Sequence, residues 1–402
     1  MKNKLTFDYA GIQMTYTMMY AGIGAFISVF LLANHFSNTE IGLVMSAANL
    51  MTVLLQPSVA DFADRTKKFM LTDLILLIAA AVGLFTAFLF FLRGHSILLF
   101  VFYVLAMGVH GFLQPLVNSL LFKVEAAGYH LNFGLCRAMG SVGYAAVTGV
   151  LGSLIEKFGI NMVPAATEIS LAMLAGMVLL MSRHYRQALS SNEAKDPAFV
   201  RTEQKDDISL TAFIKNNIPF VILNTGVIFL FFHQYIISSF MIQIITPLGG
   251  DSAQMGTMFS LSAAIEVPAM IAAGIIGRKF NSCQLLKFSM FGFILKNVLL
   301  FLAKSTFLVY VSQCTQMLGY ALFYPAMVQY IGESMSKGEA VKGQALFTIM
   351  MTIAGVLANL TGGMILDTVG VRMLVLSCLV TVIIGAVIFF VMTDRAWKGN
   401  TK

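Results

Sequence analysis

The sequence predicts an all-α polytopic membrane protein with about twelve transmembrane helices in two pseudo-symmetric six-helix halves, and with both termini in the cytoplasm. Of its 402 residues, 58% are hydrophobic and 11% are charged, whereas about 25% of residues are charged in soluble proteins. Apolar runs long enough to cross a bilayer recur along the chain. Most Lys and Arg residues lie in alternate connections, on the side that holds both termini, and positive loops favour the cytoplasm.

We expect the spans at 10–33, 41–62, 70–92, 97–121, 133–155, 161–182, 217–246, 253–277, 284–303, 306–332, 342–366 and 372–393. The long polar segment 183–216 reads as a cytoplasmic linker. It separates an N-terminal half, 1–182, from a C-terminal half, 217–402. The halves repeat weakly, because Pro115 and Gly134 in the first half correspond to Pro325 and Gly343 in the second. Such repeats are typical of transporters, in which the ligand site lies between the halves.

The stretch 132–145, NFGLCRAMGSVGYA, places Arg137 inside an apolar run. A charge at the centre of a membrane helix costs about 2.5–3.5 kcal/mol on insertion scales, so it needs water or a partner. Arg137 and Tyr144 are seven residues apart and share a helical face. Beside them runs a stripe of small residues that allows close helix packing: Gly134, Ala138, Ser141 and Ala145. Arg137 is therefore a ligand-facing cation, or it extends to the membrane surface.

Other spans also carry polar residues. The fourth span has His110, Gln114 and Asn118 spaced for one continuous helical face. Further candidates for substrate binding are Tyr20 in the first span, His233 in the seventh and Gln316 in the tenth. Each stripe alone is also explained by hydrogen bonds between helices, and each histidine by packing. Together the stripes favour a hydrated cavity.

Three further positions concern protons and gating. Glu266 in the eighth span needs a partner or a proton, so it is a candidate for both substrate binding and proton coupling. Lys296 in the ninth span is a second cavity charge or the structural partner of Glu266. A loop motif at the end of the second span comprises Asp61, Asp64 and Arg65, and it reads as a structural turn or a gating contact.

These residues resemble the major facilitator superfamily, and within it the oligosaccharide–proton symporters of the lactose permease type. The similar pieces are NFGLCRAMGSVGYA at 132–145, LLQPSVADFADR at 54–65, PLVN at 115–118 and QYI at 329–331. The resemblance implies that Arg137 contacts the sugar and that Tyr144 stands where lactose permease stacks a Trp. It also places Glu266 and Lys296 near the family's eighth-span carboxylate and ninth-span arginine.

The sequence departs from this pattern at several positions. Asn118 stands where the family's fourth-span carboxylate would pair with the arginine, and His233 lies near a seventh-span Asp. Gln316 and Gly319 replace the His and Glu of the lactose-type proton site. Ala60 replaces the Gly of the loop motif.

The leading hypothesis is a secondary transporter that moves a small polar solute, a sugar or glycoside, by proton symport and alternating access. A carrier of an organic anion is the alternative, because Arg137 and Lys296 outnumber Glu266. Drug or metabolite efflux is a third, and a membrane enzyme a fourth. We expect no enzyme, cofactor or metal site, because no HExxH, GxSxG or Cys/His cluster is present. The expected partners are the solute, protons and the lipid bilayer, not nucleic acid, and the protein is expected to be a monomer.

Overall fold

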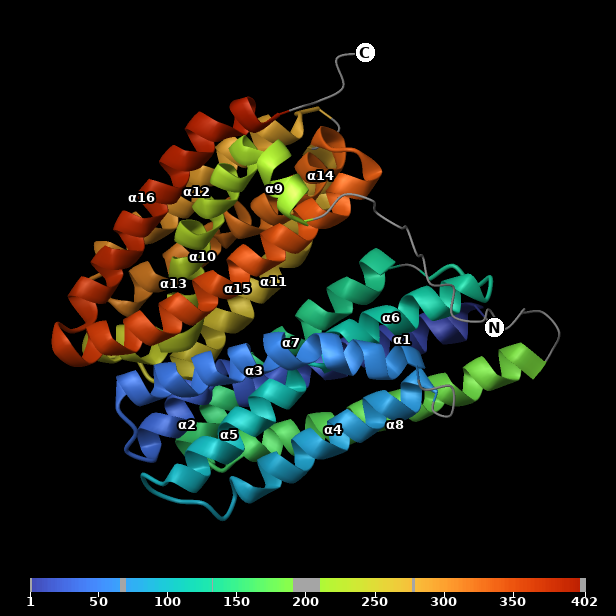
Figure 1. Ribbon diagram of the computed structural model, residues 1–402. Helices are drawn as coiled ribbons and strands as arrows, with labels where there is room; N and C mark the ends of the chain where they lie inside the picture. The colour runs from blue at the N-terminus through green and yellow to red at the C-terminus, as the bar shows by residue number, and fades with distance from the viewer. Residues whose placement is uncertain (1, 66–69, 132, 191–209, 277–278, 398–402) are drawn as a thin grey trace. The chain divides into compact units, whose positions relative to one another are not determined.

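The computed structural model describes residues 2–65, 70–131, 133–190, 210–276 and 279–397. These residues form helices joined by short connections, and they contain no strand. The chain divides into two compact units, one comprising Met1–Thr202 with Ser252–Ala263 and the other Glu203–Asp251 with Ala264–Lys402. Within each unit, long helices run alongside one another (Figure 1).

The helices of the first unit are α1 (Lys2–Tyr20), the π-helix η1 (Ala21–Ala25), α2 (Ile27–Ala33), α3 (Asn38–Arg65), α4 (Leu71–Phe88), α5 (Ile97–His110), α6 (Leu113–Ala126), α7 (Phe133–Phe158) and α8 (Met162–Ser190). The start of α11 also belongs to this unit. Its buried core joins α1, α4, α6 and α8 through side chains such as Ile12, Val82, Val117 and Leu174.

The helices of the second unit are α9 (Leu210–Asn216), α10 (Ile218–Ile245), the 3₁₀ turn η2 (Thr246–Leu248), α11 (Ser252–Ile276), α12 (Ser282–Phe301), α13 (Thr306–Cys314), the 3₁₀ turn η3 (Thr315–Met317), α14 (Tyr320–Ser334), α15 (Lys337–Thr368) and α16 (Val371–Ala396). Its core is rich in aromatic rings, among them Phe231, Phe293, Phe323 and Phe389.

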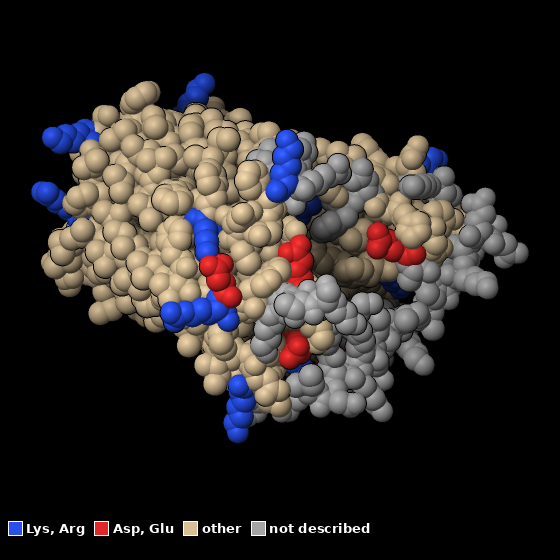
Figure 2. Space-filling model, turned by 90° about the horizontal axis from the view of Figure 1, so that it is seen from above, with Lys and Arg blue, Asp and Glu red and all other residues tan. Residues whose placement is uncertain are grey.

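Ten helical stretches within the described residues are long and apolar enough to cross a membrane. The two expected spans that are not among them are 253–277 and 306–332. The first corresponds to α11, and residue 277 lies outside the described residues. The second is divided into α13, η3 and α14. In the view of Figure 2, charged side chains are few and separated by broad uncharged surface, as expected for a chain that faces lipid.

The first membrane span is interrupted by the π-helix η1, directly after Tyr20. A π-turn leaves backbone groups that an α-helix would pair differently, and such turns often occur at functional sites. Here the hydroxyl of Tyr103 on α5 donates a hydrogen bond of 2.8 Å to the carbonyl of Ile23 inside η1. This bond supplies the partner that a backbone carbonyl needs inside a membrane.

The fourth span is also interrupted, because α5 ends at His110 and α6 begins at Leu113. Pro115 has no N–H to donate to the carbonyl of Gly111, which weakens the helix at this turn. His110, Gln114 and Asn118 were expected on one continuous helix. The structure places His110 on α5 and the other two on α6.

The closest approach of α7 to α1 differs from the expected small-residue stripe. It uses Gly140 and Gly143, where a Cβ on Gly143 would come within 2.5 Å of the Met14 carbonyl oxygen. The hydroxyl of Thr17 donates a 2.6 Å hydrogen bond to the Gly140 carbonyl. Glycine at these positions therefore brings the two backbones together and orients α7.

In the second unit, η3 and α14 meet at Gly319, whose backbone angles (φ −92°, ψ −96°) are not helical. Gly292 on α12 packs directly against this break. A Cβ on Gly292 would come within 2.3 Å of the Leu318 carbonyl carbon. The side chain of Lys296, one turn further along α12, is thereby brought to the level of η3.

We predict that Gly292→Ala destabilises the protein, because the added methyl group has only backbone atoms to displace. Overpacking of this kind costs about 1–3 kcal/mol. The control is Gly332→Ala on α14, where a Cβ meets nothing within 4 Å, and replacing a mid-helix glycine there should be neutral or stabilising. Thermal unfolding in detergent measures both, and equal melting temperatures for the two variants would contradict the packing argument.

Candidate functional site

The first unit brings four rings together from three helices. The rings of Tyr16 on α1 and His110 on α5 stack with centroids 4.9 Å apart and planes 13° apart. The ring centroid of Tyr20 lies 5.6 Å from that of His110 and 6.3 Å from that of Tyr144 on α7. We call these four residues the ring cluster. Sequence analysis selected all of them except Tyr16, whose position one helical turn before Tyr20 was the available signal.

The ring cluster lies at the two interruptions of the unit. Tyr20 is the last residue of α1 before η1, and His110 is the last residue of α5. The fold thus uses the ends of two broken helices to bring side chains from α1, α5 and α7 to one place. A similar use of interrupted helices is found at the ligand sites of many transporters.

The ring cluster combines buried and accessible groups. His110 is 3% exposed, and its Nε2 atom has no hydrogen-bond partner among the described residues. Tyr20 is 39% exposed. Buried polar atoms usually have partners, so an unpaired ring nitrogen beside the partly exposed Tyr20 indicates a place where a ligand or water binds.

Arg137 lies on the exposed side of α7, within electrostatic range of the Tyr16 phenol. Gln114 and Asn118 are half-buried on α6. The carboxylate that the family resemblance would place beside the arginine is replaced by the Asn118 amide. The five donors of the Arg137 guanidinium therefore have no acidic partner at position 118.

The second unit contains a separate polar cluster around Lys296 on α12, which is 2% exposed. Its ammonium group donates a 2.6 Å hydrogen bond to the Gln316 side-chain oxygen and a longer one, 3.4 Å, to that of Gln234. Gln316 lies on η3 and Gln234 on α10. We call these three residues the amide–lysine cluster. Gln234 was noticed in the sequence as one of several polar residues but was not selected.

Glu266 is half-buried on α11, two residues before Pro268, and it interacts electrostatically with Lys296. The two residues were predicted to be partners or independent cavity charges. The structure brings them within electrostatic range and adds the two amides as direct hydrogen-bond partners of the lysine. A buried cation held mainly by neutral oxygens is poorly compensated, so its charge remains available to pair with an anion.

His233 is completely buried on α10, next to the amide–lysine cluster in sequence. Its Nδ1 atom contacts the Leu230 carbonyl, and its ring packs edge-on against Phe293. Its Nε2 atom has no partner among the described residues. These surroundings are as consistent with a packing role for His233 as with a role in ligand binding.

Glu168 on α8 is a membrane carboxylate that sequence analysis missed. It is half-buried, and its Oε1 atom has no hydrogen-bond partner among the described residues. A single Glu in the otherwise apolar sixth span was the available signal. It is a second position at which a proton could be carried.

The loop motif at the end of α3 is described only in part. Asp61 is exposed, and the side chains of Asp64 and Arg65 lie outside the described residues, so the gating role stays a prediction. Among the residues that the structure describes, no group of three or more His, Cys, Asp or Glu side chains could hold a metal ion.

Multiple apolar helices with interrupted spans and buried polar clusters define a membrane transport protein. The chain belongs to the MFS_1 like family, whose model matches residues 9–394. It is therefore a multi-pass major facilitator transporter of the cell membrane, and not an enzyme. The family resemblance seen in the sequence is confirmed.

Individual relatives are distant. The maltose permease of Geobacillus stearothermophilus is 23% identical over 389 residues, which cover 94% of this chain and 93% of that protein. A crystal structure of a variant of the nucleoside transporter NupG superposes with a TM-score of 0.76 at 15% identity, covering 98% of this chain and 100% of the other. A bacterial homologue of the human lysosomal transporter Spinster, inward-facing and unoccupied, gives a TM-score of 0.69 at 14% identity, with 98% of both chains covered. At such identities the structures show a shared fold.

We predict that substitutions of Gln316 and of Lys296 in the amide–lysine cluster affect stability differently. Gln316→Leu removes the shorter hydrogen bond of a buried cation and should cost about 1–3 kcal/mol. Lys296→Met removes the buried charge itself, so the melting temperature should stay unchanged or rise, while transport is lost.

The double variant Lys296→Met/Gln316→Leu completes the cycle. It should be more stable than Gln316→Leu alone, because no buried charge is left without its partner. Thermal unfolding of the four proteins measures the coupling, and purely additive effects would show that the hydrogen bond contributes little.

Proposed function

We propose that the protein imports a small polar solute, a sugar or glycoside, across the cytoplasmic membrane by proton symport and alternating access. The ring cluster is the observation that carries this proposal. Sugars have apolar C–H faces and polar hydroxyl edges, and they suit aromatic rings that stand beside hydrogen-bonding groups. The similarity to a maltose permease supports the same substrate class.

In this proposal Tyr20 and Tyr144 provide the apolar surface for the sugar ring. Arg137 supplies donors in a fixed fork, and His110 Nε2 pairs with a hydroxyl group. Gln114 and Asn118 on α6 provide further amide contacts. In the second unit, His233, Gln316 and Glu266 are proposed as separate candidates for substrate binding.

Proton coupling is assigned to Glu266 and Lys296. With Glu266 ionised, its attraction holds the lysine charge in place. Protonation of Glu266 removes that attraction and leaves Lys296 with the two amide oxygens. Proton binding therefore changes the electrostatics of the amide–lysine cluster without a metal or cofactor. We also expect a monomer with both termini in the cytoplasm, from the distribution of Lys and Arg.

An organic anion, such as a sugar acid or an aromatic acid, is the second candidate substrate. It is favoured by the neutral hydrogen-bond partners of Lys296 together with the exposed position of Arg137. A bound carboxylate would compensate one of these charges.

We predict that Glu266→Gln lowers the accumulation of solute driven by a pH gradient at least tenfold and leaves solute exchange intact. The amide keeps the shape of the side chain but cannot carry a proton. The matched control is Glu168→Gln, another half-buried carboxylate within a span. Uptake and counterflow in proteoliposomes separate the two activities.

The Glu168→Gln control also tests which of the two carboxylates couples transport to protons. Loss of accumulation in Glu168→Gln with normal behaviour of Glu266→Gln would move proton coupling to the first unit. Full accumulation in both variants would refute coupling through either carboxylate.

We predict that neutral sugars raise the melting temperature of the wild-type protein but not that of Arg137→Ala. The panel contains neutral sugars, sugar acids, nucleosides and lipophilic cations. Arg372→Ala, which removes an exposed arginine at the start of α16, serves as the control and should respond like the wild type.

The other outcomes discriminate among the candidates. Stabilisation by acids alone would support the organic-anion function. A response only to lipophilic cations, unchanged in Arg137→Ala, would support efflux and remove Arg137 from the site.

A further inference from the structure

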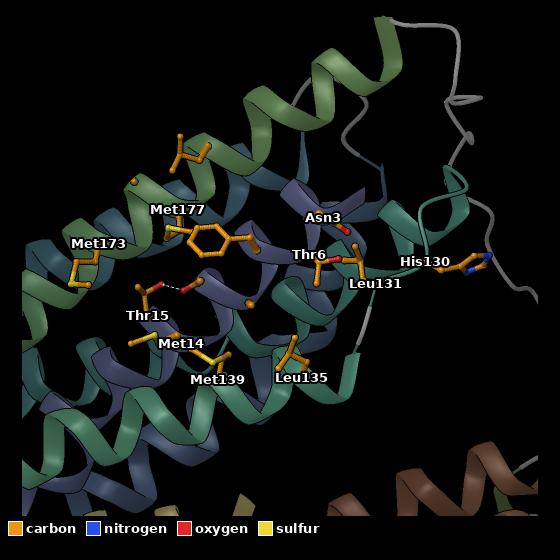
Figure 3. A pocket seen from close by; sticks show the side chains of 15 residues that line it. Asn3, Thr6, Met14, Thr15, His130, Leu131, Leu135, Met139, Met173 and Met177 are labelled. Atoms are coloured by element: carbon orange, nitrogen blue, oxygen red, sulfur yellow. Dashed lines mark hydrogen bonds between the residues drawn. The ribbon is translucent and has the colours of Figure 1, made fainter. Parts of the chain in front are cut away.

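A cavity of about 1000 Å³ lies in the first unit, between α1, α7 and α8. Figure 3 shows Met14 and Thr15 on α1, Met139 on α7, and Met173 and Met177 on α8 around its apolar part. We call this cavity the methionine groove. None of the residues of the ring cluster lines it, so it is separate from the proposed sugar site.

The methionine groove opens onto an apolar surface. Leu135 is 53% exposed, Met173 43% and Leu180 42%, and all three line the groove. The three helices that form it belong to stretches able to cross a membrane. Exposed apolar side chains at such positions contact lipid, so lipid molecules have direct access to the groove.

The groove has a polar end and an apolar end. Asn3 and Thr6 lie at one end, near the start of α1 and beside Leu131, with His130 further out, and Met173 and Met177 lie at the other end (Figure 3). Lys4, adjacent to the polar end in sequence, is exposed. A phospholipid has the same distribution, with a charged phosphate next to two acyl chains.

The length of the groove matches one membrane leaflet. Its α1 wall runs from Asn3 to Thr15, which at 1.5 Å per residue corresponds to about 18 Å. The hydrocarbon core of a bilayer is about 30 Å thick, so one leaflet contributes about 15 Å. The first stretch able to cross a membrane begins at Asn3, so the start of α1 is expected near the headgroups.

The walls suit a flexible chain. Methionine side chains adapt to irregular apolar shapes. A Cβ on Gly176 of α8 would meet no atom within 4 Å, whereas one on Gly11 of α1 would collide with the mobile end of the Met177 side chain. Gly176 therefore leaves open space in the groove, and Met177 can move to adjust it.

We infer that the methionine groove binds one acyl chain of a membrane phospholipid, with the phosphate at the end lined by Asn3, Thr6 and His130. The bound lipid would fill the space between α1, α7 and α8. This site does not depend on which solute the protein transports.

The test is retention of lipid by the purified full-length transporter. Wild-type protein is reconstituted in vesicles of equal parts phosphatidylglycerol and phosphatidylethanolamine, extracted in mild detergent and analysed by native mass spectrometry. Gly176→Phe and the smaller Gly176→Leu fill the groove from α8. The matched control is Leu179→Phe, which adds a ring to an exposed residue of the same helix that does not line the groove.

We expect one phospholipid to remain on the wild type and on Leu179→Phe, and at least fivefold less on both Gly176 variants. Added phosphatidylglycerol should raise the melting temperature of the first two proteins only. Equal retention by all four proteins would overturn the inference. Gly176→Leu preserves the test if the larger Phe prevents folding.

Discussion

The structure depends on one constraint: every polar backbone group in the hydrocarbon region needs a partner within the protein. An unbroken helix meets this requirement through its own backbone hydrogen bonds. In this chain the helices are interrupted at a few positions. The Tyr103 hydroxyl pairs with the Ile23 carbonyl in the π-turn. Glycine at position 292 allows α12 to cover the break at Gly319. Each departure is thus enclosed by neighbouring helices, and each lies next to a functional candidate.

The two units stabilise their buried polar side chains in different ways. The first gathers aromatic rings, whose edges and faces tolerate an apolar surrounding. The second buries a cation and surrounds it with amide oxygens. The first arrangement suits recognition of a solute with both apolar and polar faces. The second suits a change of charge, because a neutral partner does not compensate the lysine fully.

Much of this architecture was predictable from the sequence. Apolar length indicates the spans, and a proline such as Pro115 indicates where a helix is weakened. The polar residues within spans likewise indicated most of the ring cluster. Glu168 was overlooked because it is the only charged residue of the sixth span and does not belong to a polar stripe.

Other features depend on three-dimensional packing. The partnership of Lys296 with Gln316 requires the 3₁₀ turn η3, whereas the sequence pattern predicted one unbroken span at 306–332. The contact of α1 with α7 through Gly140 and Gly143, instead of the adjacent small residues, depends on the rotation of α7 about its axis. Such rotations follow from the packing of several helices at once, so the pattern of one helix does not determine them.

The π-turn after Tyr20 has a consequence for how this family can vary. A π-turn holds one more residue than the α-helical turn it replaces, and one residue corresponds to about 100° of helix rotation and 1.5 Å of length. Loss of one residue from Ala21–Ala25 would hardly alter the length of the span. An α-helical turn completes the same circle with one residue fewer, so Tyr16 and Tyr20 would keep their direction relative to α2. A single-codon deletion at this point would therefore convert the π-turn into an ordinary helical turn without changing which side of α1 faces His110.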